Sequence, residues 1–510
     1  MFVCVARRDH QQGPSGFTFT ETEEDDTDFR LVDSRATNRP RTNKTRPRGG
    51  NRPGGGGFRM YSSSYTPQRT GQPVRGRQPY NRGGFQQRGG GRGGQGGRSG
   101  GYQSYGARRM GDSRRFDASI NVNPEWGDPV ETWEFSKLTK LRETVQYPSE
   151  DSEVLLECGK VGFFNYDFAK SVSTKQPKTL ARNFATEKTF LKVTSSEDPN
   201  LRRFASEGAG NVFMTDAMLS ALMAMPRALY SWDLVITKSG DQIWFDRRTS
   251  KFDAITVNEN SSEPPDNTET DPLNTPSRLS AEAVACQQNF SQQVLVKDKT
   301  HSLPFTSPFS TDSNASTLAP IGYRYVSMPV GDKYTVIVRA DIDAVKLDKD
   351  GQVENMSVKT LNEYDAKVTG DWRKKMEVQR GGVLATELKN NMFKIQRWAL
   401  QALFAGCNTI EIGYLSRQQP KDAVVHHILS VQSYSPQEFF TGMSINLNQM
   451  WSIVELVLDR ISSEDDGKYL LYKEAAVPNV KLYKIPSTSV VATESTPEAA
   501  AATGGLQVLK

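Results

Sequence analysis

The stretch from residue 36 to residue 115 limits what this chain can fold into, because it cannot supply a hydrophobic core. Its central part, residues 82–106, reads RGGFQQRGGGRGGQGGRSGGYQSYG and shows no apolar periodicity. Segments of this composition bury too little apolar surface to offset the conformational entropy that is lost on folding. We therefore expect residues 1–115 to form a long disordered basic arm, with the fold C-terminal to it.

Charge divides the chain at the same place. Residues 36–115 contain 17 arginines and one lysine against one aspartate, which gives a net charge of +17. Because the whole chain carries +5, all other residues together carry −12. The arm therefore suits polyanionic partners, whereas the acidic remainder is expected to be folded.

The cysteines and apolar runs exclude several classes of protein. The four cysteines lie far apart without a Cys-x-x-Cys pair, and four histidines offer no zinc-finger spacing. No apolar run reaches the roughly 20 residues of a membrane-spanning helix, and the N-terminal apolar stretch is too short for a signal peptide. We expect a cytoplasmic protein with no membrane contact, metal ion or cofactor.

Two apolar segments that flank the basic stretch are expected to dock. In segment 25–36, acidic residues precede a small apolar cluster, which is typical of a motif that becomes ordered on a partner; a solvated tail is the alternative. Segment 116–152 has more apolar surface than a linker needs, so it docks on the main domain or on another subunit. The residues concerned are Phe29, Leu31, Val32, Trp126 and Trp133.

Residues 153–486 alternate between strand and helix patterns, which predicts an α/β domain with a mixed sheet and flanking helices. Residues 231–248 indicate a hairpin that turns at Ser239-Gly240. Residues 256–275 are polar and contain three prolines, which predicts an exposed loop. Further strands are expected within 333–345, 356–365 and 409–417, helices within 215–226, 278–295 and 386–406 (the last closed by Gly406), and a disordered tail over 487–510.

The Arg-Gly-rich block, residues 82–106, predicts RNA binding. Arginine binds phosphates by charge and stacks on bases, and aromatic rings add base stacking worth roughly 1–3 kcal/mol each. Little sequence preference and a steep salt dependence follow; a solubilising tail without obligatory RNA is the alternative. The residues expected to contact RNA are Arg82, Phe85, Arg88, Arg92, Arg98, Tyr102 and Tyr105.

A possible hydrolytic site lies on two strands. Asp341 and Asp343 share one face of the first strand, and Ser357 and Lys359 share one face of the next, because side chains alternate along a strand. Metal-dependent nucleases place acid-x-acid beside Glu-x-Lys, so that carboxylates hold Mg²⁺ and the lysine orients water. Here Ser357 takes the glutamate position and supplies no negative charge; ordinary surface acids are the simpler interpretation.

The acidic part of the chain also contains many aromatic residues, most of them expected in the core: Tyr230, Trp232, Trp244, Trp372 and Trp398. An acidic, aromatic surface also suits a methylated guanine that carries positive charge. Such a base stacks on rings and donates hydrogen bonds to carboxylates.

Several long blocks, in one order, show a family likeness. They are GNVFMTDAMLSALMAMPRALYSWD, FDAITVNENSSEPP, EAVACQQNFSQQ, KTLNEYDAKVTGDWRKKMEVQRGGVLATELKNNMFKIQRWALQALFAG and DGKYLLYKE. Together they resemble the d subunits of eukaryotic translation initiation factor 3 over about residues 153–486. The resemblance implies an mRNA cap-binding domain with a fold similar to the DXO-type decapping nucleases. It also implies that Asp341, Asp343, Ser357 and Lys359 are remnants of the nuclease metal site.

The resemblance further implies where RNA and partners bind. The family more often shows an Asn-His pair where Gln287-Gln288 stands here. A loop called the RNA gate corresponds to Lys251 to Pro265. The implied partners are other subunits of the factor, notably subunit e, the small ribosomal subunit and the mRNA 5′ cap. Cap and RNA contacts are implied for Asp216, Leu229, Tyr230, Val284, Gln287 and Gln288.

We therefore expect a non-enzymatic, RNA-binding subunit of initiation factor 3. It would recognise the 5′ cap of selected mRNAs and contribute to mRNA recruitment and to assembly of the 43S preinitiation complex. Two alternatives stay open. One is a residual Mg²⁺-dependent decapping or 5′-end nuclease, and the other is a pure scaffold subunit with a decayed pocket.

Overall fold

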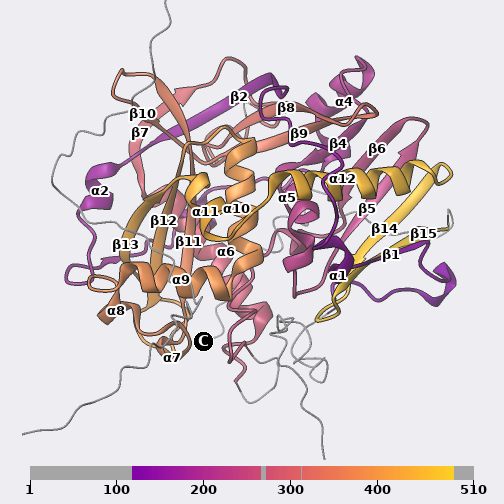
Figure 1. Ribbon diagram of the computed structural model, residues 1–510. Coiled ribbons are helices and arrows are strands. Elements are labelled where there is room, and N and C mark those ends of the chain that lie inside the picture. The colour runs from indigo at the N-terminus through magenta and orange to yellow at the C-terminus, as the bar shows by residue number, and fades with distance from the viewer. Residues whose placement is uncertain (1–117, 266–270, 312, 487–510) are drawn as a thin grey trace, which may run out of the picture. The chain divides into compact units, whose positions relative to one another are not determined.

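The predicted strands assemble into a mixed sheet (Figure 1). The computed structural model describes residues 118–265, 271–311 and 313–486. Within them the strand order is β1 (Glu131–Glu134), β15 (Asn479–Ile485), β14 (Gly467–Lys473), β5 (Trp232–Ser239), β6 (Gln242–Arg247), β4 (Val212–Thr215), β9 (Tyr334–Ile342), β8 (Gly322–Val330), β2 (Glu153–Phe164), β10 (Ala344–Leu347), β11 (Val353–Glu363), β12 (Thr409–Arg417), β13 (His426–Tyr434) and β3 (Lys178–Thr179). A further strand, β7 (Leu295–Ser302), pairs with β2. β11 pairs in parallel with β12, which pairs antiparallel with β13, so the predicted mixed α/β class is confirmed.

Helices pack on both faces of β11 and β12 (Figure 1). Leu361 belongs to the core that includes α5 (Asp216–Ala224), α10 (Met392–Phe404) and α12 (Leu447–Ser462). Val358, which faces the other way, belongs to the core that includes α6 (Pro276–Gln293). The other described α-helices are α1 (Phe135–Leu138), α2 (Tyr166–Lys170), α3 (Phe184–Glu187), α4 (Pro199–Ser206), α7 (Ala366–Thr369), α8 (Trp372–Lys375), α9 (Arg380–Asn390) and α11 (Pro436–Gly442).

The predicted hairpin is present as β5 and β6. Ser239 pairs with Gln242, and Gly240 in the turn has a φ of +57°. Glycine adopts this left-handed conformation without the steric cost that a Cβ atom would add. Three of the aromatic residues expected in the core are buried: Trp232, Trp372 and Trp398.

The prediction of one continuous helix over 386–406 is wrong. α9 ends at Asn390, α10 begins at Met392, and Asn391 between them has a φ of −127°. The buried Asn391 side chain donates to Asn258 Oδ1 at 3.0 Å and to the Glu387 carboxylate at 2.8 Å. The bond to Asn258 joins residues far apart in the sequence, so local periodicity could not reveal it. Gly406 ends α10 as expected, with a φ of +66°.

Segment 116–152 docks on its own domain over its described residues. β1 extends the sheet beside β15, and Trp133 is buried in the main core. Trp126 packs beside Tyr483 of β15 in a second cluster. Farther along, the Ser452 hydroxyl of α12 accepts from the backbone N–H of Thr144 at 2.8 Å. Of the two expected docking partners, the structure therefore places this segment on the main domain, and the buried Trp133 is not available to another subunit.

The predictions for the arm and the tail concern residues outside the described ranges. Among the described helices, none combines the length and apolar character needed to cross a membrane. Three sets of predictions lie outside the described ranges. They are the docking residues Phe29, Leu31 and Val32 of segment 25–36, the tail 487–510, and the block residues Arg82, Phe85, Arg88, Arg92, Arg98, Tyr102 and Tyr105.

Candidate nucleic-acid interface

The predicted remnant residues lie together where β9 ends. Asp343 follows β9, and one of its carboxylate oxygens accepts from Lys359 Nζ at 2.7 Å, Ser357 Oγ at 3.1 Å and the Val358 backbone N–H at 2.8 Å. Burial opposes the Lys359 charge, but the Asp343 carboxylate outweighs it, so the pKa of Lys359 lies above its ordinary value. The alternation inferred from sequence thus places the two strands' polar side chains in direct contact.

Asp216 joins this cluster from the start of α5. β4 stops at Thr215, and the Asp216 carboxylate then accepts from the backbone N–H of Asp341 on β9 at 3.4 Å. Asp216 is buried, and burial followed by the charge of Asp341 raises the pKa of Asp216 to about 7. This carboxyl group can therefore change its protonation state near neutral pH when a ligand binds.

The donor set does not fit a divalent metal ion. Ser357 replaces one carboxylate, and Lys359 neutralises Asp343, whose bonded oxygen already accepts three hydrogen bonds. Over the described ranges, no group of three or more His, Cys, Asp or Glu residues is arranged to hold a metal ion. The cluster can form hydrogen bonds and stabilise charge, but it lacks the set of oxygen ligands that Mg²⁺ requires.

The second predicted group, on α6, contacts β11 from the opposite face. Gln287 Nε2 donates to the Val358 carbonyl at 2.6 Å, and Gln287 Oε1 accepts from Thr360 Oγ1 at 3.3 Å. Val358 and Thr360 alternate with Ser357 and Lys359, so the sheet separates Gln287 from the aspartate cluster. Its neighbours Val284 and Gln288 are half-buried on the same helix. The structure therefore does not bring the two predicted groups of cap residues into one contact set.

The segment predicted as a gate, residues 251–265, packs against α9 and α10. Asn258 is buried, its backbone N–H donates to Asn391 Oδ1 at 2.7 Å, and the backbone N–H of Asn260 donates to the Asn390 carbonyl at 3.2 Å. The expectation of an exposed loop from residue 256 is wrong for residues 257–261, most of which are buried. These residues are buried because two of their backbone N–H groups bind Asn390 and Asn391, where α9 ends and α10 begins.

The gate also covers the predicted stacking residue. The Tyr230 hydroxyl donates to the Val257 carbonyl at 3.4 Å. The carbonyl of Leu229, the preceding residue, accepts from the backbone N–H of Ala476 at 2.9 Å. Val257 packs in turn with Leu279 of α6. The gate segment thus lies between the chain after α5 and the start of α6, and displacing it changes the surroundings of Tyr230.

The sequence analysis did not predict the buried charges within the gate segment and on the elements around it. Glu259 is fully buried, and burial raises its pKa to about 7 although Lys394 and Lys473 stabilise its charge. Burial likewise lowers the pKa of both lysines to about 8. Glu387 of α9 is also buried, with a pKa of about 7. The sequence does contain a sign of these buried charges, because Lys394 interrupts the apolar face of a helix and Lys473 lies inside an apolar strand.

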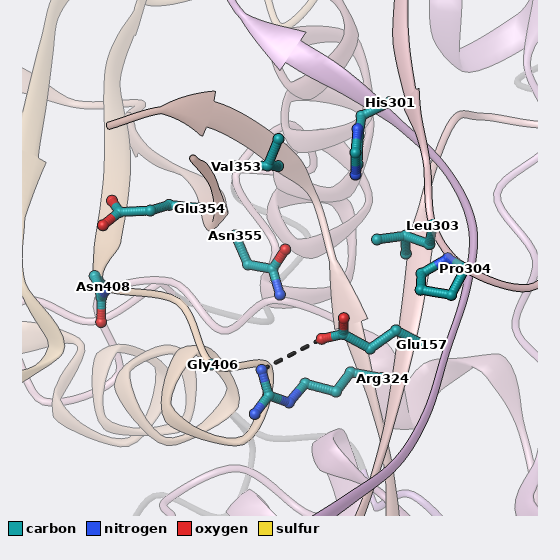
Figure 2. Close-up of a pocket in the computed structure, with 10 residues that line it drawn as sticks. All are labelled: Glu157, His301, Leu303, Pro304, Arg324, Val353, Glu354, Asn355, Gly406 and Asn408. Carbon is teal, nitrogen blue, oxygen red and sulfur yellow. Dashed lines mark hydrogen bonds and ion pairs between the residues drawn. The ribbon is translucent and has the colours of Figure 1, made fainter. Parts of the chain in front are cut away.

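A separate cavity of about 410 Å³ lies near the start of β11 (Figure 2). Arg324 lies on its floor, paired with Glu157 at 3.3 Å and packed so closely on Gly406 that a Cβ atom there would lie 2.1 Å from the guanidinium. Glu354 in its wall pairs with Lys346 at 3.2 Å. None of the predicted cap residues lines this cavity. Its arginine and both acids already form ion pairs within the chain, and the cavity is distinct from the candidate interface.

Comparison with known proteins assigns the family. A family model described as "Eukaryotic translation initiation factor 3 subunit 7 (eIF-3)" matches residues 6–484. The chain belongs to this family. Two relatives carry the name of the D subunit of eukaryotic translation initiation factor 3. The protein from Nematostella vectensis is 36% identical over 483 residues, which cover 92% of this chain and 81% of the relative. The protein from Arabidopsis thaliana is 39% identical over 378 residues, which cover 74% of this chain but only 62% of the relative.

Solved structures similar to this member of the initiation factor 3 family are Rai1 and Dxo1 proteins. Scheffersomyces stipitis Rai1, solved with (3′-NADP)+ and calcium ion, covers 65% of this chain and 84% of its own at a TM-score of 0.41 and 12% identity. K. lactis Dxo1, solved with manganese, covers 70% of this chain and 98% of its own at a TM-score of 0.38 and 7% identity.

Proposed function

We propose that this chain is a non-enzymatic, RNA-binding subunit of translation initiation factor 3 that recognises the 5′ cap of selected mRNAs. Family membership supports the role in translation initiation. Cap recognition rests on one observation: the buried Asp216 carboxyl lies beside Asp341, and Lys359 neutralises Asp343. These groups can bind the edge of a base, and they lack a metal-binding set of carboxylates.

The chemistry of a methylated guanine fits these groups. Its positive charge favours the ionised form of Asp216, and its edge N–H groups donate to that carboxylate. The ring of Tyr230 offers a stacking face once the Val257 carbonyl, which now binds its hydroxyl, has moved away. In this proposal the gate segment must therefore open before the cap enters, and recognition involves no covalent step.

The same proposal assigns the remaining partners. The basic arm touches RNA and tethers the chain to the factor, notably to subunit e, near the small ribosomal subunit. The chain then acts in the cytoplasm, in mRNA recruitment and in assembly of the 43S preinitiation complex.

Crosslinking of a cap-labelled mRNA in a reconstituted initiation complex tests this function. We expect Asp216→Ala and Tyr230→Ala each to weaken the crosslink to this chain while the factor stays assembled. Asp241→Ala, which removes an exposed carboxylate from the β5–β6 turn, is the matched control. Unchanged crosslinking in both site variants would reject the site. Equal crosslinking of capped and uncapped RNA by the wild-type chain would favour the pure scaffold.

A second experiment separates recognition from hydrolysis. Purified chain is incubated with labelled capped RNA and Mg²⁺, and we expect no cap product. Release of a cap product that Asp343→Ala abolishes would establish the residual decapping or 5′-end nuclease instead.

A further inference from the structure

A lysine-rich surface lies beside the candidate interface on an otherwise acidic part of the chain. Outside residues 36–115 the chain carries a net −12, yet residues 168–186 contain four basic residues and no acidic one. Residues 366–386 contain five basic residues against two acidic ones. We call Lys175, Lys178, Lys367, Lys374 and Lys375 the basic face.

Two distant parts of the sequence form this surface together. β3 carries Lys178 and pairs with β13, whose His427 Nδ1 lies 3.3 Å from an Arg373 guanidinium nitrogen of α8. Glu377, just after α8, pairs with Lys175 at 3.3 Å. The loop before β3 therefore lies beside α8, which carries Lys374 and Lys375 at its end. Figure 1 shows α7, α8 and α9 as neighbours.

The charges of the basic face are open to a ligand. The side chains of Lys175 and Lys374 are each 83% exposed, although each pairs with an acid. Such exposed pairs contribute only about 0–1 kcal/mol, so a phosphate can replace the carboxylate at little cost. Lys367 and Lys375 are also exposed and form no ion pair within the described residues.

The basic face continues from the candidate interface. Val368 of α7 packs against a cluster that contains Val257 of the gate segment and Tyr364, the residue after β11. Lys367 is therefore the direct sequence neighbour of a residue that packs on the cluster to which the gate contributes. An RNA chain that leaves the gate on this side meets lysines, although residues 116–486 as a whole carry a net charge of −7.

We propose that the basic face binds the phosphate backbone of the single-stranded mRNA that follows the capped 5′ end. This proposal rests on the proposed function for the identity of the RNA. The lysines contact phosphates by charge alone, so binding is independent of sequence, grows with RNA length and weakens with salt. The basic face thus adds affinity for the body of the message, whereas the cluster around Asp216 reads its end.

The test uses the full chain with Lys175→Gln, Lys367→Gln, Lys374→Gln and Lys375→Gln combined. The control carries Lys137→Gln, Lys140→Gln, Lys349→Gln and Lys468→Gln, four exposed lysines elsewhere on the domain. Both variants lose the same net charge. Affinity for a long uncapped RNA, a long capped RNA and a short capped oligonucleotide is measured between low and high salt.

In the test variant we expect the slope of log affinity against log salt to become shallower by about 3 for both long RNAs. Each of the four lost lysine–phosphate contacts removes about 0.7 from the magnitude of the slope. The control variant and the short capped oligonucleotide should keep wild-type behaviour. Equal losses in the two variants, an unchanged slope, or an equal loss for the short oligonucleotide would each overturn the proposal. The proposal would also be overturned if the test variant lost binding to an acidic polypeptide such as polyglutamate but kept its affinity for RNA, because the basic face would then bind a protein. The long uncapped RNA reports on the basic face even if cap recognition fails.

Discussion

At the scale of single residues, the candidate interface is organised by buried charges that neutralise one another. The Asp343 carboxylate takes a lysine, a hydroxyl and a backbone N–H, which are the partners a buried anion needs. Asp216 forms no ion pair with any described residue, and burial raises its pKa to about 7. The oxygen of Asp343 that accepts these bonds is thus occupied by partners within the chain, whereas the Asp216 carboxyl can respond to a ligand.

Replacing Lys359 with methionine keeps the length of the side chain but removes the cation that balances Asp343. Breaking a buried ion pair costs about 3–5 kcal/mol, and these side chains are only 14–16% exposed. We expect the free energy of unfolding in urea to fall by about 2–4 kcal/mol. Lys468→Met, at an exposed lysine, should change it by less than about 0.5 kcal/mol. Similar values for the two variants would contradict the buried pair.

Two buried carboxyls, one in the gate segment and one on α9, predict how stability depends on pH. Burial raises the pKa of Glu259 and Glu387 to about 7, above the 4.5 of an unfolded chain. The unfolded chain therefore binds fewer protons between these values, and stability falls as the pH rises from about 5 to 7. We expect Glu387→Gln to flatten this fall in urea unfolding measured across that range. If the stability of the Glu387→Gln variant fell as steeply as that of the wild type, the raised pKa of Glu387 would be contradicted.

At the scale of elements, the join between α9 and α10 positions the gate. Asn391 both separates the two helices and binds Asn258 through its side-chain oxygen and nitrogen. The gate segment is therefore attached to the sheet by way of these helices. Val257 and Tyr364 extend the contact to α6 and to the end of β11.

We expect Asn391→Ala to loosen the gate, because it leaves the buried Asn258 N–H and the Glu387 carboxylate without their partners. Each unsatisfied buried group costs about 1–3 kcal/mol. Hydrogen exchange of the amides of residues 257–261 should become faster, while exchange in β11 and β12 stays slow. Asn408→Ala, at an exposed position whose side chain forms no hydrogen bond with the described residues, serves as the control. Unchanged exchange at 257–261 would show that other contacts hold the gate.

The elements also show what the sequence can predict. Period-two alternation located the strands of Asp343 and Lys359 and the face that they share, because each pattern is local. The break at Asn391 depends on Asn258, which lies 133 residues away. The position of Gln287 on the opposite face of β11 depends on the packing of α6 against the sheet. Local patterns therefore predict the strands, whereas tertiary packing decides which side chains meet.

At the scale of the whole molecule, positive charge is concentrated at two places. The arm carries +17 over residues 36–115, and the basic face gathers lysines on a domain, residues 116–486, whose net charge is −7. Both suit a phosphate backbone, and neither contains the groups that would recognise a cap. Affinity for RNA and preference for its end should therefore respond to different substitutions.

Deleting residues 82–106 tests this separation. The deletion removes four arginines and three aromatic residues that can stack on bases. We expect the slope of log affinity against log salt to fall by about 3 for a long RNA, with the ratio of capped to uncapped binding unchanged. The deletion and the four-lysine variant change separate parts of the sequence, and we expect their effects on binding free energy to add when each part binds RNA independently. Loss of the cap preference on deletion would mean that the Arg-Gly-rich block itself takes part in reading the end of the message.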